Sequence, residues 1–135
     1  MRLWHQRLIP ILPRQQLLGQ HRECCALRGK GWGRKHATVD YVFKHDPSLL
    51  IAYHWLVLDE MRNREYKYAP EWNSAEYRGK QLGVDKHWYN ILILLTPVRD
   101  LDGNERILYP EHDDVYLKGC LDNLKRKGVI LNVSN

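Results

Sequence analysis

The first strong helical pattern in the chain lies between Pro13 and Arg28. Apolar residues recur there at i, i+1, i+7 and i+8, which places them on one face of a helix. That face consists of Leu17, Leu18, Cys24 and Cys25. Proline suits the first turn of a helix and glycine its end, so we predict a helix from Pro13 to about Arg28 that ends at Gly29. The two cysteines are expected to fill space as small buried hydrophobes.

A second helix is predicted after His45. Asp46 is a favourable N-cap, and Pro47 occupies the first helical position. Apolar residues cover most of the circumference over 49–61, which is typical of a central, buried helix. His54 lies inside this stretch, and we expect a core histidine that is satisfied by hydrogen bonds rather than a ligand.

A third helix is predicted to open at Pro110. Its carboxylates come first and its basic residues last, as the helix dipole favours. The carboxylates are Glu111, Asp113 and Asp114, and the basic residues are Lys125, Arg126 and Lys127. An apolar stripe at helical spacing supports the prediction: Leu117, Cys120, Leu121 and Leu124. Because the dipole accounts for the carboxylates, no metal is needed to explain them.

The remaining segments carry weaker patterns. We expect the first ten or so residues to be extended and the connections over 65–108 to be irregular. The stretch NILILLTPV, residues 90–98, is consistent with a strand or with a short helix. Asp102-Gly103 is typical of a hairpin turn, so a small hairpin within 81–108 is allowed.

The net charge and the cysteine content indicate which kinds of partner and site to expect. The 135 residues include 21 Lys or Arg against 16 Asp or Glu, and this net charge of +5 favours a polyanionic partner. Three cysteines, two of them adjacent, form a poor disulfide framework. No CxxC or HxxxH spacing is present, which argues against a zinc site.

The chain reads as one domain, 1–135, of a cytoplasmic protein. No apolar run approaches the ~18 residues that a membrane helix needs. The opening residues, MRLWHQRLIP, lack the apolar region of a signal peptide. We therefore expect no contact with a membrane.

Two polar features could contact a partner. The glycine-rich loop GKGWGRKH, residues 29–36, offers Lys30, Arg34 and Lys35 to phosphates, although a plain connector fits equally well. It lacks Walker A spacing, which argues against a nucleotide site. On the first helix, Arg22 and Glu23 lie on a polar face with small residues, as in a docking surface; a solvated face explains the pair as well.

Four short motifs resemble those of the pyrimidine-dimer DNA glycosylases, the phage endonuclease V type. In LPRQQLLGQHRE, residues 12–23, the family pattern Leu-x-x-Gln-x-Leu-x-x-x-x-Arg-Glu is matched throughout. The matching residues are Leu12, Gln15, Leu17, Arg22 and Glu23. HATVDY at 36–41, EYRG at 76–79 and YPEH at 109–112 resemble later family motifs in the same order. The resemblance implies an all-α fold of three main helices, with the N-terminus against the first two.

The resemblance also implies a chemistry. In this family the α-amine of the chain attacks C1′ of the damaged nucleotide, an imine forms, and β-elimination cuts the strand. An α-amine has a pKa of about 7.7–8.0, so more of it is neutral at pH 7 than of a lysine amine. Because Arg2 is too large for normal removal of Met1, the resemblance makes Met1 the nucleophile. Glu23 becomes the carboxylate that stabilises positive charge at C1′ and shuttles protons.

The implied partner is double-stranded, damaged DNA, bound by a monomer without a metal or other cofactor. The expected DNA-binding residues are Arg2, Gln15, Gln16, Arg22, Arg28, Lys30, Arg34, Lys35 and His36.

Some positions depart from the family pattern. Ala26 stands where the family has an arginine, and the aromatic C-terminal tail is missing. An inserted segment carries Trp88 and Tyr89, which are candidates for stacking on bases. These departures bear on dimer specificity more than on imine chemistry. The alternatives are a non-catalytic nucleic-acid-binding protein of the same fold, an imine-forming lyase for other damaged or abasic sites, and a protein-interaction domain.

Overall fold

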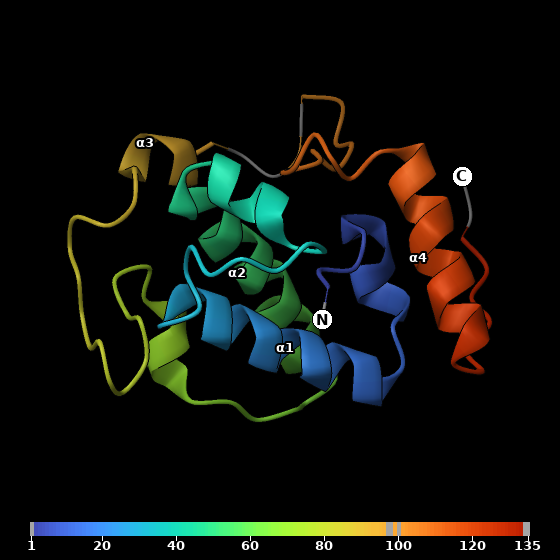
Figure 1. Cartoon of the computed structure of the whole chain (residues 1–135), viewed down its shortest axis with the longest axis horizontal. Helices are drawn as coiled ribbons and strands as arrows, with labels where there is room; N and C mark the ends of the chain where they lie inside the picture. The colour runs from blue at the N-terminus through green and yellow to red at the C-terminus, as the bar shows by residue number, and fades with distance from the viewer. Residues whose placement is uncertain (1, 97–98, 100, 134–135) are drawn as a thin grey trace.

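Three long helices, joined by irregular connections and short 3₁₀ turns, build the structure (Figure 1). The computed structural model describes residues 2–96, 99 and 101–133. The long helices are α1 (Arg14–Arg28), α2 (Pro47–Asn63) and α4 (Asp114–Arg126), and α3 (Ile91–Leu94) is a single turn. Within the described ranges there are isolated β-bridges but no strand. The expected all-α fold of three main helices is confirmed.

Helix α1 ends at Arg28 before Gly29 as predicted, and it begins one residue later than predicted, with Pro13 as its N-cap. The amides of Gly29 and Gly31 both donate to the carbonyl of Ala26, at 3.1 and 2.9 Å, and close the end of the helix. A Cβ on Gly31 would lie 2.7 Å from the Ala26 carbonyl oxygen, so the turn requires glycine there.

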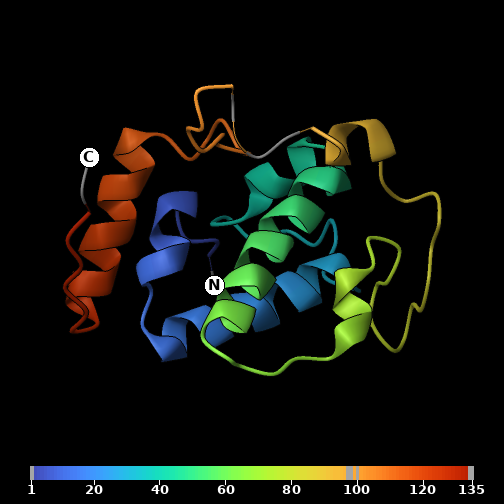
Figure 2. The same ribbon diagram turned by 180° about the vertical axis from the view of Figure 1, so that it is seen from behind.

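Helix α2 is the central helix and crosses α1, as the view from behind shows (Figure 2). Asp46 caps it as predicted, because its carboxylate accepts a 2.8 Å hydrogen bond from the Ser48 amide. The helix is buried along most of its length, at Leu50, Ile51, Tyr53, His54, Val57, Leu58 and Met61. This confirms the prediction of a buried helix from a nearly continuous apolar circumference.

The N-terminal segment lies between the α1–α2 pair and α4 (Figure 1). The prediction that about ten residues are extended is wrong beyond position 5, because Gln6–Ile11 forms a 3₁₀ helix, η1. The His5 side chain caps η1 by accepting a hydrogen bond from the Arg7 amide, and the turn buries both Leu8 and Ile9. An extended strand would have pointed these two neighbours in opposite directions.

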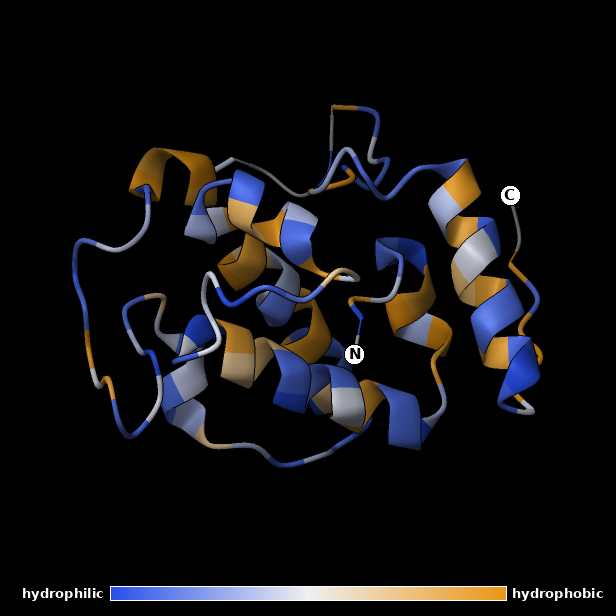
Figure 3. Cartoon of the chain, viewed as in Figure 1, coloured by the Kyte–Doolittle hydropathy of each residue, from blue (hydrophilic) through white to orange (hydrophobic). Residues whose placement is uncertain are grey.

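The prediction that the last helix opens at Pro110 is also wrong, since α4 begins at Asp114. Asp113 is the N-cap and accepts a 2.8 Å hydrogen bond from the Tyr116 amide. Glu111 instead accepts a 2.8 Å hydrogen bond from Nε2 of His45, which ties this connection to the start of α2. Figure 3 shows hydrophilic and hydrophobic bands alternating along α4, whereas α3 is uniformly hydrophobic.

The connections over 65–108 are irregular, as expected. Residues 91–94 form a helical turn rather than a strand, while residues 97 and 98 of the same stretch lie outside the described residues. The predicted hairpin is reduced to single antiparallel bridges, Tyr77 with Val84 and Arg99 with Glu105, and the second encloses Asp102-Gly103. Among the described helices, none combines the length and the apolar character needed to cross a membrane.

Candidate active site

A polar cavity of about 350 Å³ opens between α1, the N-terminal segment and α4. Its lining residues are Arg2, Trp4, Gln15, Gln16, Gly19, Gln20, Arg22, Glu23, Thr38, Asn123 and Lys127. Several residues predicted from the sequence therefore meet at one place: Arg2, Gln15, Gln16, Arg22 and Glu23. We call this space the Glu23 cavity.

The register of α1 explains why these residues meet. Positions 15–16, 19–20 and 22–23 recur three to four residues apart, so they share one face of the helix. Gly19 lies at the centre of this series and has no side chain. The opposite face carries the buried Leu17 and Cys24, which hold α1 against the core.

Glu23 has the most unusual environment in the cavity. Its side chain is half-buried, and its Oε1 atom is buried without a hydrogen bond from any described residue. Burial raises the pKa of the Glu23 carboxyl above its ordinary value. A carboxylate with a free oxygen can stabilise a nearby cation, and a raised pKa makes it a better proton acceptor.

Gln20 attaches the N-terminal segment to the wall of this cavity. Its Oε1 accepts hydrogen bonds from the Trp4 amide and the Tyr53 hydroxyl, each at 2.6 Å. Its Nε2 donates a 3.0 Å hydrogen bond to the carbonyl of Arg2. One buried side chain thus holds the backbone on both sides of Leu3. Gln20 cannot be recognised from the sequence, because a glutamine on a polar helix face carries no sign of burial.

Helix α4 supplies cavity residues from the far end of the chain. Asn123 contributes an Oδ1 atom that is buried and unpartnered by the described residues. The Lys127 ammonium lies 5.3 Å from the centroid of the Trp4 ring, and the Arg2 guanidinium lies 5.8 Å from it. From the sequence Lys127 is expected only to complement the helix dipole, and no local signal places it beside Trp4.

The other predicted site residues lie apart from the cavity. Met1 lies outside the described residues. Lys30, Arg34, Lys35 and His36 are exposed on the loop after α1 and do not line the Glu23 cavity.

Arg28 requires a correction. It was expected to bind DNA, but it is fully buried with 0% exposure. Its guanidinium donates hydrogen bonds to the carbonyls of Trp72, Ser74 and Tyr77 at 2.6–3.0 Å. It also lies 3.1 Å from Nδ1 of His54. Arg28 therefore joins α1 to α2 and to the segment after it, and is not available to a phosphate.

Trp88, a candidate for stacking on bases, is held by the protein. Its indole N–H donates a 2.9 Å hydrogen bond to the carbonyl of Ala75. The Arg78 guanidinium lies 4.2 Å from the centroid of its ring, and Trp32 meets it edge-on. Neither Trp88 nor Tyr89 lines the Glu23 cavity.

Comparison with known proteins gives the class of the molecule. The sequence matches the profile of a family described as pyrimidine dimer DNA glycosylase over residues 1–74. No curated protein and no solved structure matches the chain. The matched span covers more than half of the 135 residues, so the chain belongs to the pyrimidine dimer DNA glycosylase family. The span contains the N-terminal segment, α1 and α2, whereas α4 and the motifs at 76–79 and 109–112 lie beyond it.

Proposed function

We propose that this protein is a DNA glycosylase with abasic-site lyase activity on UV-damaged DNA, and that its α-amine and Glu23 perform the chemistry. The observation that carries the proposal is the unpartnered Oε1 atom of Glu23, which is buried in the wall of a cavity that Arg2 also lines. The nucleophile would belong to Met1, the residue joined to Arg2. Membership in the family supports the same assignment.

The reaction would proceed in two stages. The neutral α-amine attacks C1′ of the damaged nucleotide, the bond from C1′ to the base breaks, and the base leaves with a proton. The C1′–O4′ bond of the sugar then opens as O4′ takes up a proton, which leaves a protonated imine between the amine and C1′. This imine loses a proton from C2′, and the bond from C3′ to its phosphate oxygen breaks. The protein must stabilise the positive charge at C1′ and carry out two proton transfers. A carboxylate of raised pKa can do both.

The surface around the cavity suits a polyanion. Arg22 is exposed at its edge, and Lys127 is exposed on the α4 side. The loop with Lys30, Arg34 and Lys35 follows the same helix and would contact phosphates farther along the duplex. DNA affinity should therefore fall steeply as the salt concentration rises.

Borohydride trapping tests the proposal. The protein is mixed with a cyclobutane-dimer duplex or an abasic duplex, borohydride is added, and the covalent adduct is located by peptide mapping. We expect an adduct on the Met1 amine with both duplexes. Protein with an acetylated N-terminus is the matched control, and it should bind DNA without forming the adduct.

Other outcomes would contradict parts of the proposal. An adduct with the abasic duplex alone would indicate a lyase rather than a dimer glycosylase. DNA binding without an adduct, from protein with a free N-terminus, would leave a non-catalytic binding protein.

A further inference from the structure

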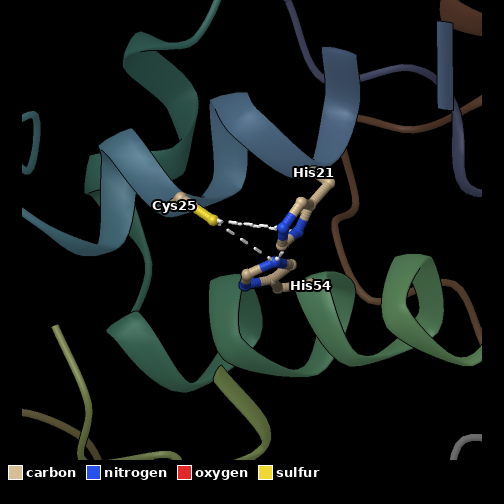
Figure 4. A group of neighbouring side chains, drawn as sticks. All are labelled: His21, Cys25 and His54. Carbon is tan, nitrogen blue, oxygen red and sulfur yellow. Dashed lines mark hydrogen bonds between the residues drawn. The ribbon is translucent and has the colours of Figure 1, made fainter. Parts of the chain in front are cut away.

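Three potential metal ligands meet between α1 and α2, away from the Glu23 cavity. His21 and Cys25 lie one turn apart on α1, and His54 faces them from α2 (Figure 4). Nδ1 of His21 lies 2.9 Å from Nε2 of His54. The sulfur of Cys25 lies 3.7 Å from Nδ1 of His21 and 4.0 Å from Nε2 of His54.

We propose that His21, Cys25 and His54 form a binding site for one zinc ion, or for another divalent metal that prefers nitrogen and sulfur ligands. This inference does not rest on the proposed function, because none of the three residues lines the Glu23 cavity. The CxxC and HxxxH spacings whose absence argued against a zinc site do not cover a mixed His-Cys pair four residues apart on a helix. The third ligand, His54, was expected to be a core histidine and comes from another helix.

The distances fit a tetrahedral ion. Zinc lies about 2.0–2.1 Å from histidine nitrogens and about 2.3 Å from a cysteine sulfur, so its ligand atoms are roughly 3.3–3.6 Å apart. The nitrogens of His21 and His54 must separate slightly from 2.9 Å, and the Cys25 sulfur must approach slightly from 3.7 and 4.0 Å. Each shift in distance is a few tenths of an ångström. Because the sulfur also lies 3.8 Å from Nε2 of His21, the His21 ring must turn as well for its Nδ1 to face the metal.

The site also has an entry path. His54 is buried, but His21 and Cys25 are half-exposed. Cys25 also lines an open hollow of about 350 Å³ beside Trp72 and the loop after α1. A metal can therefore enter from this side, and a water molecule can occupy the fourth position.

The protonation states of the three ligands determine how many protons are released when a metal ion binds. Histidine binds a metal as a neutral ring, and cysteine binds it as a thiolate. An ordinary thiol is protonated at neutral pH, so the metal must displace the Cys25 proton. One proton should therefore be released for each metal ion bound.

Arg28 is the group that opposes the metal. Its guanidinium can only donate, so Nδ1 of His54 accepts from it and the ring proton lies on Nε2, where it is donated to His21. A metal bound at Nε2 of His54 would displace this proton, and the ring would then carry its proton on Nδ1. Nδ1 of His54 and Nη1 of Arg28, now 3.1 Å apart, would then both be donors and would have to separate, while Arg28 keeps its three carbonyl partners.

The negative charge of a Cys25 thiolate would partly offset the unfavourable effect of Arg28 on a bound metal ion. Arg28 has no carboxylate partner among the described salt bridges. Arg22 also acts on His21, so two guanidinium groups disfavour a cation here. The thiolate that forms at Cys25 on metal binding would place a negative charge close to Arg28, which makes that thiolate an essential part of the site.

The full chain, treated with a chelator, can be titrated with Co²⁺ as a spectroscopic substitute for zinc. We expect one Co²⁺ per chain, with thiolate-to-cobalt charge transfer in the near ultraviolet, the release of one proton, and displacement by Zn²⁺. Cys25→Ser should lose the charge-transfer band. His21→Gln should weaken metal affinity at least about tenfold. Both changes are at half-exposed positions, where the fold should tolerate them.

Two control variants make the test specific. Cys24→Ala removes the adjacent buried thiol, and His87→Gln removes an exposed histidine. Both should retain the cobalt spectrum. The absence of a charge-transfer band in folded wild-type protein would overturn the proposal, as would equal binding by wild type, Cys25→Ser and His21→Gln.

Discussion

The backbone amide of Trp4 donates a 2.6 Å hydrogen bond to Oε1 of Gln20, and both residues are buried. The same side chain binds the Arg2 carbonyl through its Nε2 atom. Helix α1 therefore positions the N-terminal segment with the residue that lies one turn before Glu23. If the α-amine is the nucleophile, Gln20 helps to position it, because this side chain holds the backbone of Arg2 and Trp4.

Replacing Gln20 with Met keeps most of the side-chain volume and removes every hydrogen bond. We expect the Trp4 amide to lose its partner, at a cost of about 1–3 kcal/mol in the free energy of unfolding. Adduct formation in borohydride trapping should slow roughly 10- to 100-fold, because the N-terminal segment is no longer oriented. DNA affinity should stay close to that of wild type. Gln81→Met, at an exposed position, is the control, and an unchanged trapping rate in Gln20→Met would contradict this role.

Replacing Glu23 with Gln separates catalysis from stability. Turnover on a dimer duplex should fall by about 10²–10⁴-fold, while duplex binding is retained. Because burial raises the pKa of Glu23, the ionised form is disfavoured in the folded protein, and this penalty grows as the pH rises through the folded pKa. The variant should therefore unfold in urea with a free energy no lower than that of wild type at neutral pH. Glu71→Gln, at an exposed site, should change neither quantity.

Arg22 and Arg28 lie on the same helix and should respond differently to substitution. Arg22→Gln should weaken DNA binding and reduce the slope of log affinity against log salt by about 1, since one phosphate contact is lost. Arg28→Lys should leave carbonyl acceptors unpaired and lower the free energy of unfolding by about 2 kcal/mol or more. A salt slope that changes in Arg28→Lys but not in Arg22→Gln would contradict this assignment.

His112 should make the protein less stable in mild acid. Burial lowers its pKa to about 3, and its Nδ1 accepts a hydrogen bond from the Gln6 amide. Below about pH 6.5 the His112 ring binds a proton in the unfolded chain but not in the folded one. The free energy of unfolding therefore falls as the pH drops from about 6.5 toward 3. One such histidine contributes a slope of up to about 1.4 kcal/mol per pH unit.

Urea unfolding at a series of pH values between 7 and 4 measures that slope. His112→Gln keeps an acceptor for the Gln6 amide but cannot titrate. It should be less stable than wild type at pH 7, because the 2.6 Å contact with the Tyr41 hydroxyl is lost, and its stability should depend less on pH. A slope equal to that of wild type would show that His112 takes no part.

Two glycines near α1 should respond to alanine with opposite signs. Gly19 lies inside the helix, and an added Cβ would come no closer than 3.7 Å to Arg22, so Gly19→Ala should stabilise the protein by about 0.5–1 kcal/mol. At Gly31 the Cβ would lie 2.7 Å from the Ala26 carbonyl oxygen, so Gly31→Ala should destabilise it. Urea unfolding measures both changes, and a stabilised Gly31→Ala variant would show that the turn can relax.

The sequence alone determined which segments become the three long helices, and it identified the residues that bound α1 and that begin α2. Pro13, Gly29 and Asp46 act on backbone groups within a few residues, and an apolar stripe repeats with every helical turn. Such signals are local, so they can be recognised without knowing how helices pack. The Arg22-Glu23 pair and its family pattern belong to the same local information.

Only the tertiary structure decided which polar residues would be buried and what they would meet. Arg28 and Arg22 differ in the face of α1 that they occupy, and packing against α2 turned one of them inward. Lys127 reaches Trp4, and His54 reaches Cys25, across long stretches of sequence. These contacts depend on the relative placement of helices, which is set by the shape of the whole core and not by the residues beside each one in the chain.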